Sequence, residues 1–120
     1  MEDRFKFRVW DDDNECFDYL DFNDLEKVKH TIDSYNEYFW SGYFKENPQY
    51  LMQCTGIKDK NGKLIYEGDI VERENVQGKK RGVVSFNQAL LHFEVPNMSL
   101  FSLTHRAEVI GNIYENPDLI

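Results

Sequence analysis

Turn-forming residues recur at short intervals between apolar segments in residues 51–71, and this spacing constrains the fold more than any other feature of the sequence. Asn61 and Gly62 are the strongest short-range hairpin signal, because a two-residue type I′ turn requires positive φ at both positions. Gly68 and Asp69 mark a second turn a few residues later. Apolar runs this short between turns predict closely spaced antiparallel strands.

The same pattern continues toward the C-terminus. Further apolar runs, each bounded by turn residues, lie at residues 70–73, 82–86, 90–95 and 108–114. Gly56 predicts a bend in the strand before the hairpin, and Gly111 predicts a bulge or a close backbone approach in the last strand. About five strands at this spacing predict a small β-barrel over residues 51–120.

The N-terminal part predicts a hairpin. Residues 5–10 alternate apolar and basic side chains with the period of a strand, and residues 16–20 form a second extended, apolar-rich segment. The alternation places Phe5, Phe7 and Val9 on one face and Lys6 and Arg8 on the other. Five polar residues, 11–15, connect the two strands and predict an acidic turn.

This acidic turn only partly resembles a calcium loop. Asp11, Asp13 and Glu15 place carboxylates at alternate positions, as such a loop does. However, position six is Cys16 where a glycine is needed, and position twelve is Phe22 where a bidentate glutamate is needed. We interpret the segment as a solvated turn.

One short helix is expected between residues 24 and 38. Asn23 can cap it, Glu26 completes a spacing that resembles a capping box, and apolar residues follow at helical intervals. Its apolar stripe either covers the β core or binds a partner. An aromatic cluster at residues 39–44 follows, in which Trp40 and Tyr43 serve either packing or contact with a ligand.

The charge of −8 disfavours general nucleic-acid binding, which depends on Lys and Arg neutralising phosphates. Residues 1–50 hold 13 acidic and 6 basic side chains, so most of the acidity lies there. The basic run Lys79, Lys80 and Arg81 is expected in or beside a polar loop at residues 75–80. With Lys58, Lys60 and Lys63 it makes a local basic surface, which nearby acidic residues dilute: Glu67, Asp69, Glu72 and Glu74.

No pattern of catalytic or cofactor-binding residues stands out. Cys54, His92 and Asp69 could be named as nucleophile, base and orienting acid, but no motif supplies an oxyanion hole. The three histidines, His30, His92 and His105, lie in separate predicted elements, and Cys16 and Cys54 lack metal-ligand spacing. Phosphate-binding glycine loops are absent from the sequence. We therefore expect no cofactor and no metal, and favour a non-catalytic role.

Three fragments together resemble the YopX family of phage and prophage proteins. They are residues 5–11, the central block of residues 51–71, and residues 109–117 with the order Val-Ile-Gly-Asn-Ile-Tyr-Glu-Asn-Pro. The resemblance implies a mainly β protein with an SH3-like barrel in its C-terminal part, encoded by a bacterial virus or prophage. It brings no catalytic residues. Residues 24–49 lie outside the resemblance.

We therefore expect one domain of residues 1–120, with an N-terminal hairpin and short helix in residues 1–50 and the barrel in residues 51–120. A protein-binding module is the favoured function, with contacts through the acidic half or near Trp40 and Tyr43. The alternative is a nucleic-acid-binding accessory protein that uses Lys79, Lys80 and Arg81. The sequence shows no leader or membrane span, which predicts a protein of the bacterial cytoplasm, and it is compatible with a homo-oligomer.

Overall fold

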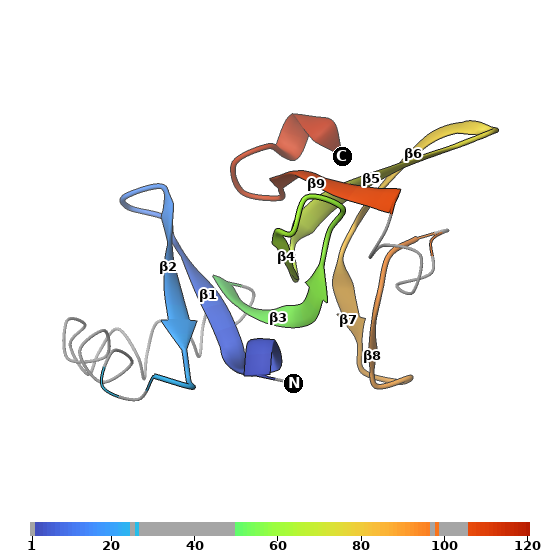
Figure 1. The fold of residues 1–120 in the computed structure, drawn as a ribbon. Coiled ribbons are helices and arrows are strands. Elements are labelled where there is room, and N and C mark those ends of the chain that lie inside the picture. The colour runs from blue at the N-terminus through green and yellow to red at the C-terminus, as the bar shows by residue number, and fades with distance from the viewer. Residues whose placement is uncertain (1, 25, 27–49, 97, 99–105) are drawn as a thin grey trace. The chain divides into compact units, whose positions relative to one another are not determined.

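The structure, a computed structural model, describes residues 2–24, 26, 50–96, 98 and 106–120 (Figure 1). Contacts divide the chain into two compact units, Met1–Cys54 and Thr55–Ile120. The predicted helix falls almost wholly outside the described residues, and the aromatic cluster with Trp40 and Tyr43 lies entirely outside them. Among the described residues, no helix is long and apolar enough to cross a membrane.

The protein is mainly β, as the sequence predicts. Its strands are β1 (Lys6–Asp11), β2 (Cys16–Asp21), β3 (Leu51–Lys58), β4 (Leu64–Tyr66), β5 (Asp69–Asn75), β6 (Gly78–Val83), β7 (Ser85–Asn87), β8 (His92–Glu94) and β9 (Ala107–Asn112). The described residues include the short 3₁₀ helices η1 (Glu2–Phe5) and η4 (Pro117–Leu119). The SH3-like topology of the barrel stays a prediction.

The first unit contains the predicted N-terminal hairpin. β1 and β2 are antiparallel, with Lys6 opposite Asp21 and Asp11 opposite Cys16, and β1 also pairs with the beginning of β3. The Asp11 carboxylate accepts bonds from the backbone N–H groups of Asp13 and Asn14, at 3.0 and 3.1 Å, and from the Asn14 side chain at 2.8 Å. The Asn14 side chain is the main cause that lowers the pKa of Asp11. The carboxylate therefore closes the turn locally, as the solvated-turn interpretation requires.

Side chains of β1 are buried on both faces of the strand. Phe5 precedes the strand in η1 and is half exposed, so its predicted place on the strand is wrong. Arg8, on the face predicted to be basic, is only 3% exposed. Its guanidinium carbon lies 4.2 Å from the centroid of the Phe17 ring, a cation–π contact that favours burying the charge. Trp10 packs against the same ring at 4.9 Å.

The second unit is built around a three-stranded sheet in the order β6, β5, β9, with β7 and β8 forming a separate two-stranded sheet. The core contains side chains from several of these elements: Ile65, Val71, Val84, Val95 and Ala107, with Ile57, Phe93, Met98 and Val109 packed around them. The register between β5 and β9 shifts at Ile70 and Val71, which face Gly111 and Val109, so that Ile110 is the extra residue of a bulge.

The central hairpin has a different turn from the one predicted. Gly62 has φ of 82°, but Asn61 does not have positive φ, so a type I′ turn is wrong. The Gly62 N–H donates to the Asp59 carbonyl at 3.0 Å, and the Asp59 N–H donates to the Lys63 carbonyl at 2.8 Å. This is a three-residue loop with a left-handed glycine as its last member, the next most common hairpin class.

Candidate interaction surface

Asp59 is a buried carboxylate that organises the central hairpin. Its Oδ1 accepts the N–H groups of Asn61 and Lys63, both at 2.9 Å, and its Oδ2 accepts the N–H of Val109 on β9 at 2.9 Å. Burial alone would raise the pKa of Asp59, but the three backbone bonds outweigh it and hold the pKa below its ordinary value. The Lys60 N–H also donates to the Ala107 carbonyl at 3.0 Å, so the loop closes one edge of β9.

Asp69 caps the second turn. The sequence alone does not decide whether this residue caps the turn or faces a ligand. Asp69 is 2% exposed, and its Oδ2 accepts the Tyr66 N–H at 2.8 Å. Gly68 has φ of 82°, and its backbone donates to the Val84 carbonyl and accepts from the Ile113 N–H, each at 2.9 Å. This turn therefore joins three segments of the second unit and offers its carboxylate to the backbone.

In the C-terminal motif, residues 109–117, side chains likewise form hydrogen bonds with the backbone. The Asn112 side chain accepts the N–H groups of Tyr114 and Glu115, and the Asn116 side chain accepts the Asn112 N–H. A Cβ atom on Gly111 would lie 2.5 Å from Oδ1 of Asn116, so only glycine leaves room for this side chain. Residues of the central block and of the C-terminal motif thus form hydrogen bonds that hold turns together.

The basic run lies on a strand, which corrects the expectation of a loop. Lys79, Lys80 and Arg81 belong to β6, whose hairpin with β5 turns at Val76 and Gln77, and successive side chains of a strand point to opposite faces. The Arg81 Nε lies 2.6 Å from Oε2 of Glu72, and the Lys79 ammonium lies 3.7 Å from Oε1 of the same carboxylate.

Glu72 therefore neutralises part of this surface. The hydrogen bond from Arg81 is the main cause that lowers the pKa of Glu72, so the carboxylate stays ionised beside the two cations. On the hairpin, Lys60 lies 3.5 Å from Glu108. Lys79 and Arg81 thus share one acid, Lys80 lies on the opposite face of β6, and Lys60 is paired with Glu108.

The residues considered for catalysis occupy unsuitable positions. Cys54 is fully buried in β3, and a buried thiol is not open to a substrate. Asp69 is held in the turn described above, and the exposed His92 places Nδ1 3.0 Å from the Phe93 carbonyl. Within the described part of the chain, no group of three or more His, Cys, Asp or Glu side chains is arranged to hold a metal ion.

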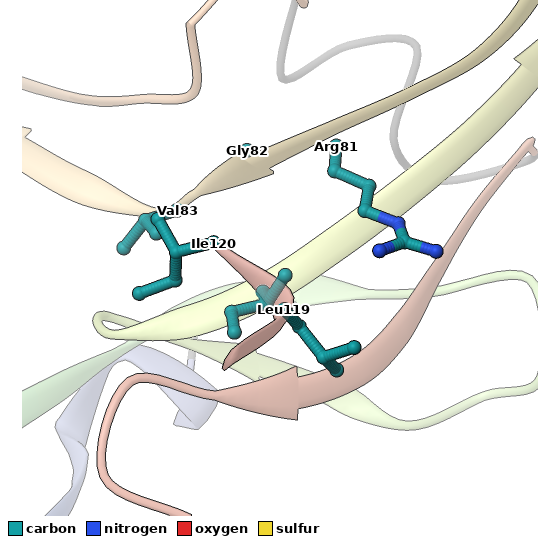
Figure 2. A pocket seen from close by; sticks show the side chains of 6 residues that line it. Arg81, Gly82, Val83, Leu119 and Ile120 are labelled. Carbon is teal, nitrogen blue, oxygen red and sulfur yellow. The ribbon is translucent and has the colours of Figure 1, made fainter. Parts of the chain in front are cut away.

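A small pocket lies beside the C-terminal residues, at the end of the β5–β6 pairing that is away from its connecting turn. It has a volume of about 70 Å³ and is lined by Ile70, Arg81, Gly82, Val83, Leu119 and Ile120. Figure 2 shows Val83 and Ile120 together on one side and the Arg81 guanidinium on the other. Ligand pockets usually measure roughly 300–1,000 Å³, so we interpret this space as a packing gap beneath η4.

An apolar surface on the β7–β8 hairpin was not predicted. Leu90 is 63% exposed, Leu91 is 77% exposed and Phe86 is 40% exposed. The sequence places Leu90 and Leu91 at the start of a strand, which is wrong, because β8 begins at His92 and the two leucines lie in the turn. We call Phe86, Leu90 and Leu91 the hairpin surface.

The turn that carries this surface is fixed by Asn87. Its Oδ1 accepts the N–H groups of Ala89 and Leu90, both at 3.0 Å, and its Nδ2 donates to Glu94 at 3.2 Å. Asn87, three residues before Leu90, is the sequence signal that could have moved the leucines from strand to turn, because asparagine commonly bonds the backbone that follows it.

Comparison with known proteins identifies the family. No curated protein matches the chain. The fold is similar to that in the crystal structure of protein EF1440 from Enterococcus faecalis, with a TM-score of 0.56 and 20% sequence identity over 95% of this chain and 96% of that chain. The family model described as YopX protein matches residues 6–120. The chain therefore belongs to the YopX family.

Proposed function

We propose that this protein is a non-catalytic interaction module that binds another protein through the hairpin surface. Membership of the YopX family supports a phage or prophage origin, and with it a host or phage protein as the partner and the bacterial cytoplasm as the site of action.

The observation that carries the proposal is the exposure of large apolar side chains on one short hairpin. Phe86, Leu90 and Leu91 come from ten consecutive residues of β7, β8 and their turn, and each is more than one-third exposed. Single exposed leucines are common on protein surfaces, whereas apolar side chains gathered on one element mark sites of contact with other proteins.

The hairpin is also suited to binding because it is ordered before a partner arrives. The Phe86 and Phe93 rings contact each other edge to face at 5.2 Å, and the Asn87 bonds fix the turn. A surface that is already ordered loses less conformational entropy when it binds.

Photo-crosslinking tests this proposal. A photoreactive amino acid at position 90, in the full chain, should capture one protein reproducibly from a bacterial lysate. The matched control carries the same group at Val76, which is fully exposed at the tip of the β5–β6 hairpin. Capture of the same proteins from both positions, or of none, would show that the hairpin surface is not the binding site.

A further inference from the structure

Asn61 and Gly62 carry a chemical reactivity besides their turn geometry. Asparagine followed by glycine deamidates more readily than other asparagine pairs, because glycine has no side chain to hinder attack by its backbone nitrogen. Both residues are exposed, and the space around the Cβ position of Gly62 is open. Water therefore reaches the pair, and burial does not protect it.

Deamidation of this pair needs only water and a base. The base removes the Gly62 N–H proton, and the backbone nitrogen forms a bond to Cγ of Asn61. The bond between Cγ and Nδ2 breaks, and Nδ2 leaves as ammonia with the proton that the base returns. Water then opens the five-membered imide at either carbonyl, which leaves aspartate or isoaspartate at position 61.

The folded hairpin holds the attacking nitrogen away from this carbon. The Gly62 N–H donates to the Asp59 carbonyl at 3.0 Å, and Asn61 does not have positive φ, which together define a type I turn. At the position of Asn61 in such a turn ψ is about 0°, so the Gly62 nitrogen lies beside the backbone nitrogen of Asn61. Formation of the imide requires this nitrogen beside Cβ of Asn61, so the turn must open first.

The Asp59 carboxylate keeps the turn closed. It accepts the Asn61 N–H inside the loop and the Val109 N–H on β9, both at 2.9 Å. The side chain that would react is also held, because Nδ2 of Asn61 donates to Oε1 of Glu108 at 3.4 Å. Rotation of Asn61 into the reactive geometry therefore requires the loss of backbone and side-chain hydrogen bonds.

We propose that Asn61 is a deamidation site that the bonds of Asp59 hold unreactive, and that it reacts only in chains whose central hairpin has opened. The reaction is irreversible because ammonia is lost to the solvent. Isoaspartate adds one carbon to the backbone, which a three-residue loop between paired strands cannot absorb. Either product also places a new carboxylate beside Glu108 and Asp59. Deamidation is thus a permanent mark that this hairpin has opened.

Peptide mass spectrometry of the full chain measures the deamidation rate at Asn61 during incubation at mildly alkaline pH. We expect the rate in the folded wild type to be at least about tenfold below that of the same chain in urea, because opening of the hairpin is unfavourable. Asn14, which is exposed and followed by glutamate, is the internal reference and should react slowly in urea. Equal rates at Asn61 in the folded and unfolded chains, or no faster reaction than at Asn14 in urea, would overturn the proposal.

The variant Asp59→Ala tests the role of the carboxylate. Folded Asp59→Ala should deamidate at Asn61 about tenfold faster than the wild type, because it lacks the three bonds that close the hairpin. Gly68→Ala is the matched control, since it destabilises another turn of the same unit and keeps the Asp59 bonds; its rate should equal that of the wild type. Equal acceleration in both variants, or none in Asp59→Ala, would show that these bonds do not control the site.

Two further measurements keep the proposal testable. If Asp59→Ala does not fold, Asp59→Ser replaces it, because one hydroxyl oxygen keeps at most the bonds within the loop. Asp59→Ser should also deamidate faster than the wild type, and a wild-type rate would count against the proposal. The deamidated chain, separated by ion exchange, should unfold at a lower midpoint than the intact chain. An unchanged midpoint would contradict the expected damage to the turn.

Discussion

Asp59 shows at the residue scale how one carboxylate can hold a hairpin and a distant strand together. The sequence places it among turn residues, and its bonds to Asn61 and Lys63 follow from that position. Its third bond, to Val109, could not be predicted because the donor is fifty residues away in the chain. The burial of Arg8 could not be predicted either. Alternation assigns Arg8 to one face of β1, but it does not show that the Phe17 ring lies beside the guanidinium.

Replacement of Asp59 by asparagine should lower the free energy of unfolding by about 1–3 kcal/mol at neutral pH, because an amide cannot accept all three buried N–H bonds. The measurement is urea denaturation at a series of pH values. Asp118→Asn, at an exposed position, is the control for loss of one charge.

The pH dependence gives this prediction its sign. Folding lowers the pKa of Asp59 below its ordinary value of 3.8, so the unfolded chain binds the proton more tightly. The contribution of ionised Asp59 to the free energy of unfolding is complete at pH values above the ordinary pKa. It is lost as the pH falls through the lower pKa of the folded state. The gap between wild type and Asp59→Asn should therefore narrow under acid conditions, and a gap that is constant with pH would contradict this role.

At the scale of elements, the sequence predicts where strands turn better than how they turn. Asn61 and Gly62 correctly locate the central hairpin, but the carboxylate of Asp59 favours a three-residue loop in which Gly62 alone has positive φ. Apolar composition likewise assigns Leu90 and Leu91 to a strand, although both lie in a turn in which the Leu90 N–H donates to Asn87 Oδ1. In both turns a side chain accepts hydrogen bonds from the backbone, and the alternation of apolar and polar residues in a sequence does not reveal such bonds.

Gly68→Ala and Gly62→Ala should both destabilise the protein, since each places a Cβ at φ of 82°, at a cost of about 1–2 kcal/mol. We expect the larger loss for Gly68, because its buried turn bonds both Val84 and Ile113, whereas Gly62 has open space around its Cβ position. Thermal unfolding of the two variants gives the order. Equal midpoints, or a lower midpoint for Gly62→Ala, would contradict this assignment.

At the scale of the whole molecule, the net charge and the family are the features that can be predicted most directly from the sequence. The match to the YopX family model spans residues 6–120 and covers the three fragments except for Phe5. The hairpin surface could not be predicted from the sequence. The exposure of a leucine depends on the residues that the fold places next to it, and adjacent leucines are equally typical of a buried core.

We expect no retardation of DNA or RNA oligonucleotides in a gel shift at low salt, because the chain carries a net charge of −8 and Glu72 pairs with Lys79 and Arg81. The triple variant Lys79→Ala, Lys80→Ala, Arg81→Ala should behave as the wild type does. A wild-type shift that weakens with salt and disappears in the triple variant would instead establish nucleic-acid binding.

The bond between Asp59 and Val109 has a further consequence for solubility. An open strand edge is a template on which other chains can add as strands, and at β9 the carboxylate occupies a backbone donor that such a chain would use. Protonation of Asp59 weakens this protection while the rest of β9 is still folded. Loss of this bond in acid should therefore open one donor of the β9 edge to strand addition, and light scattering across a pH series measures the resulting self-association.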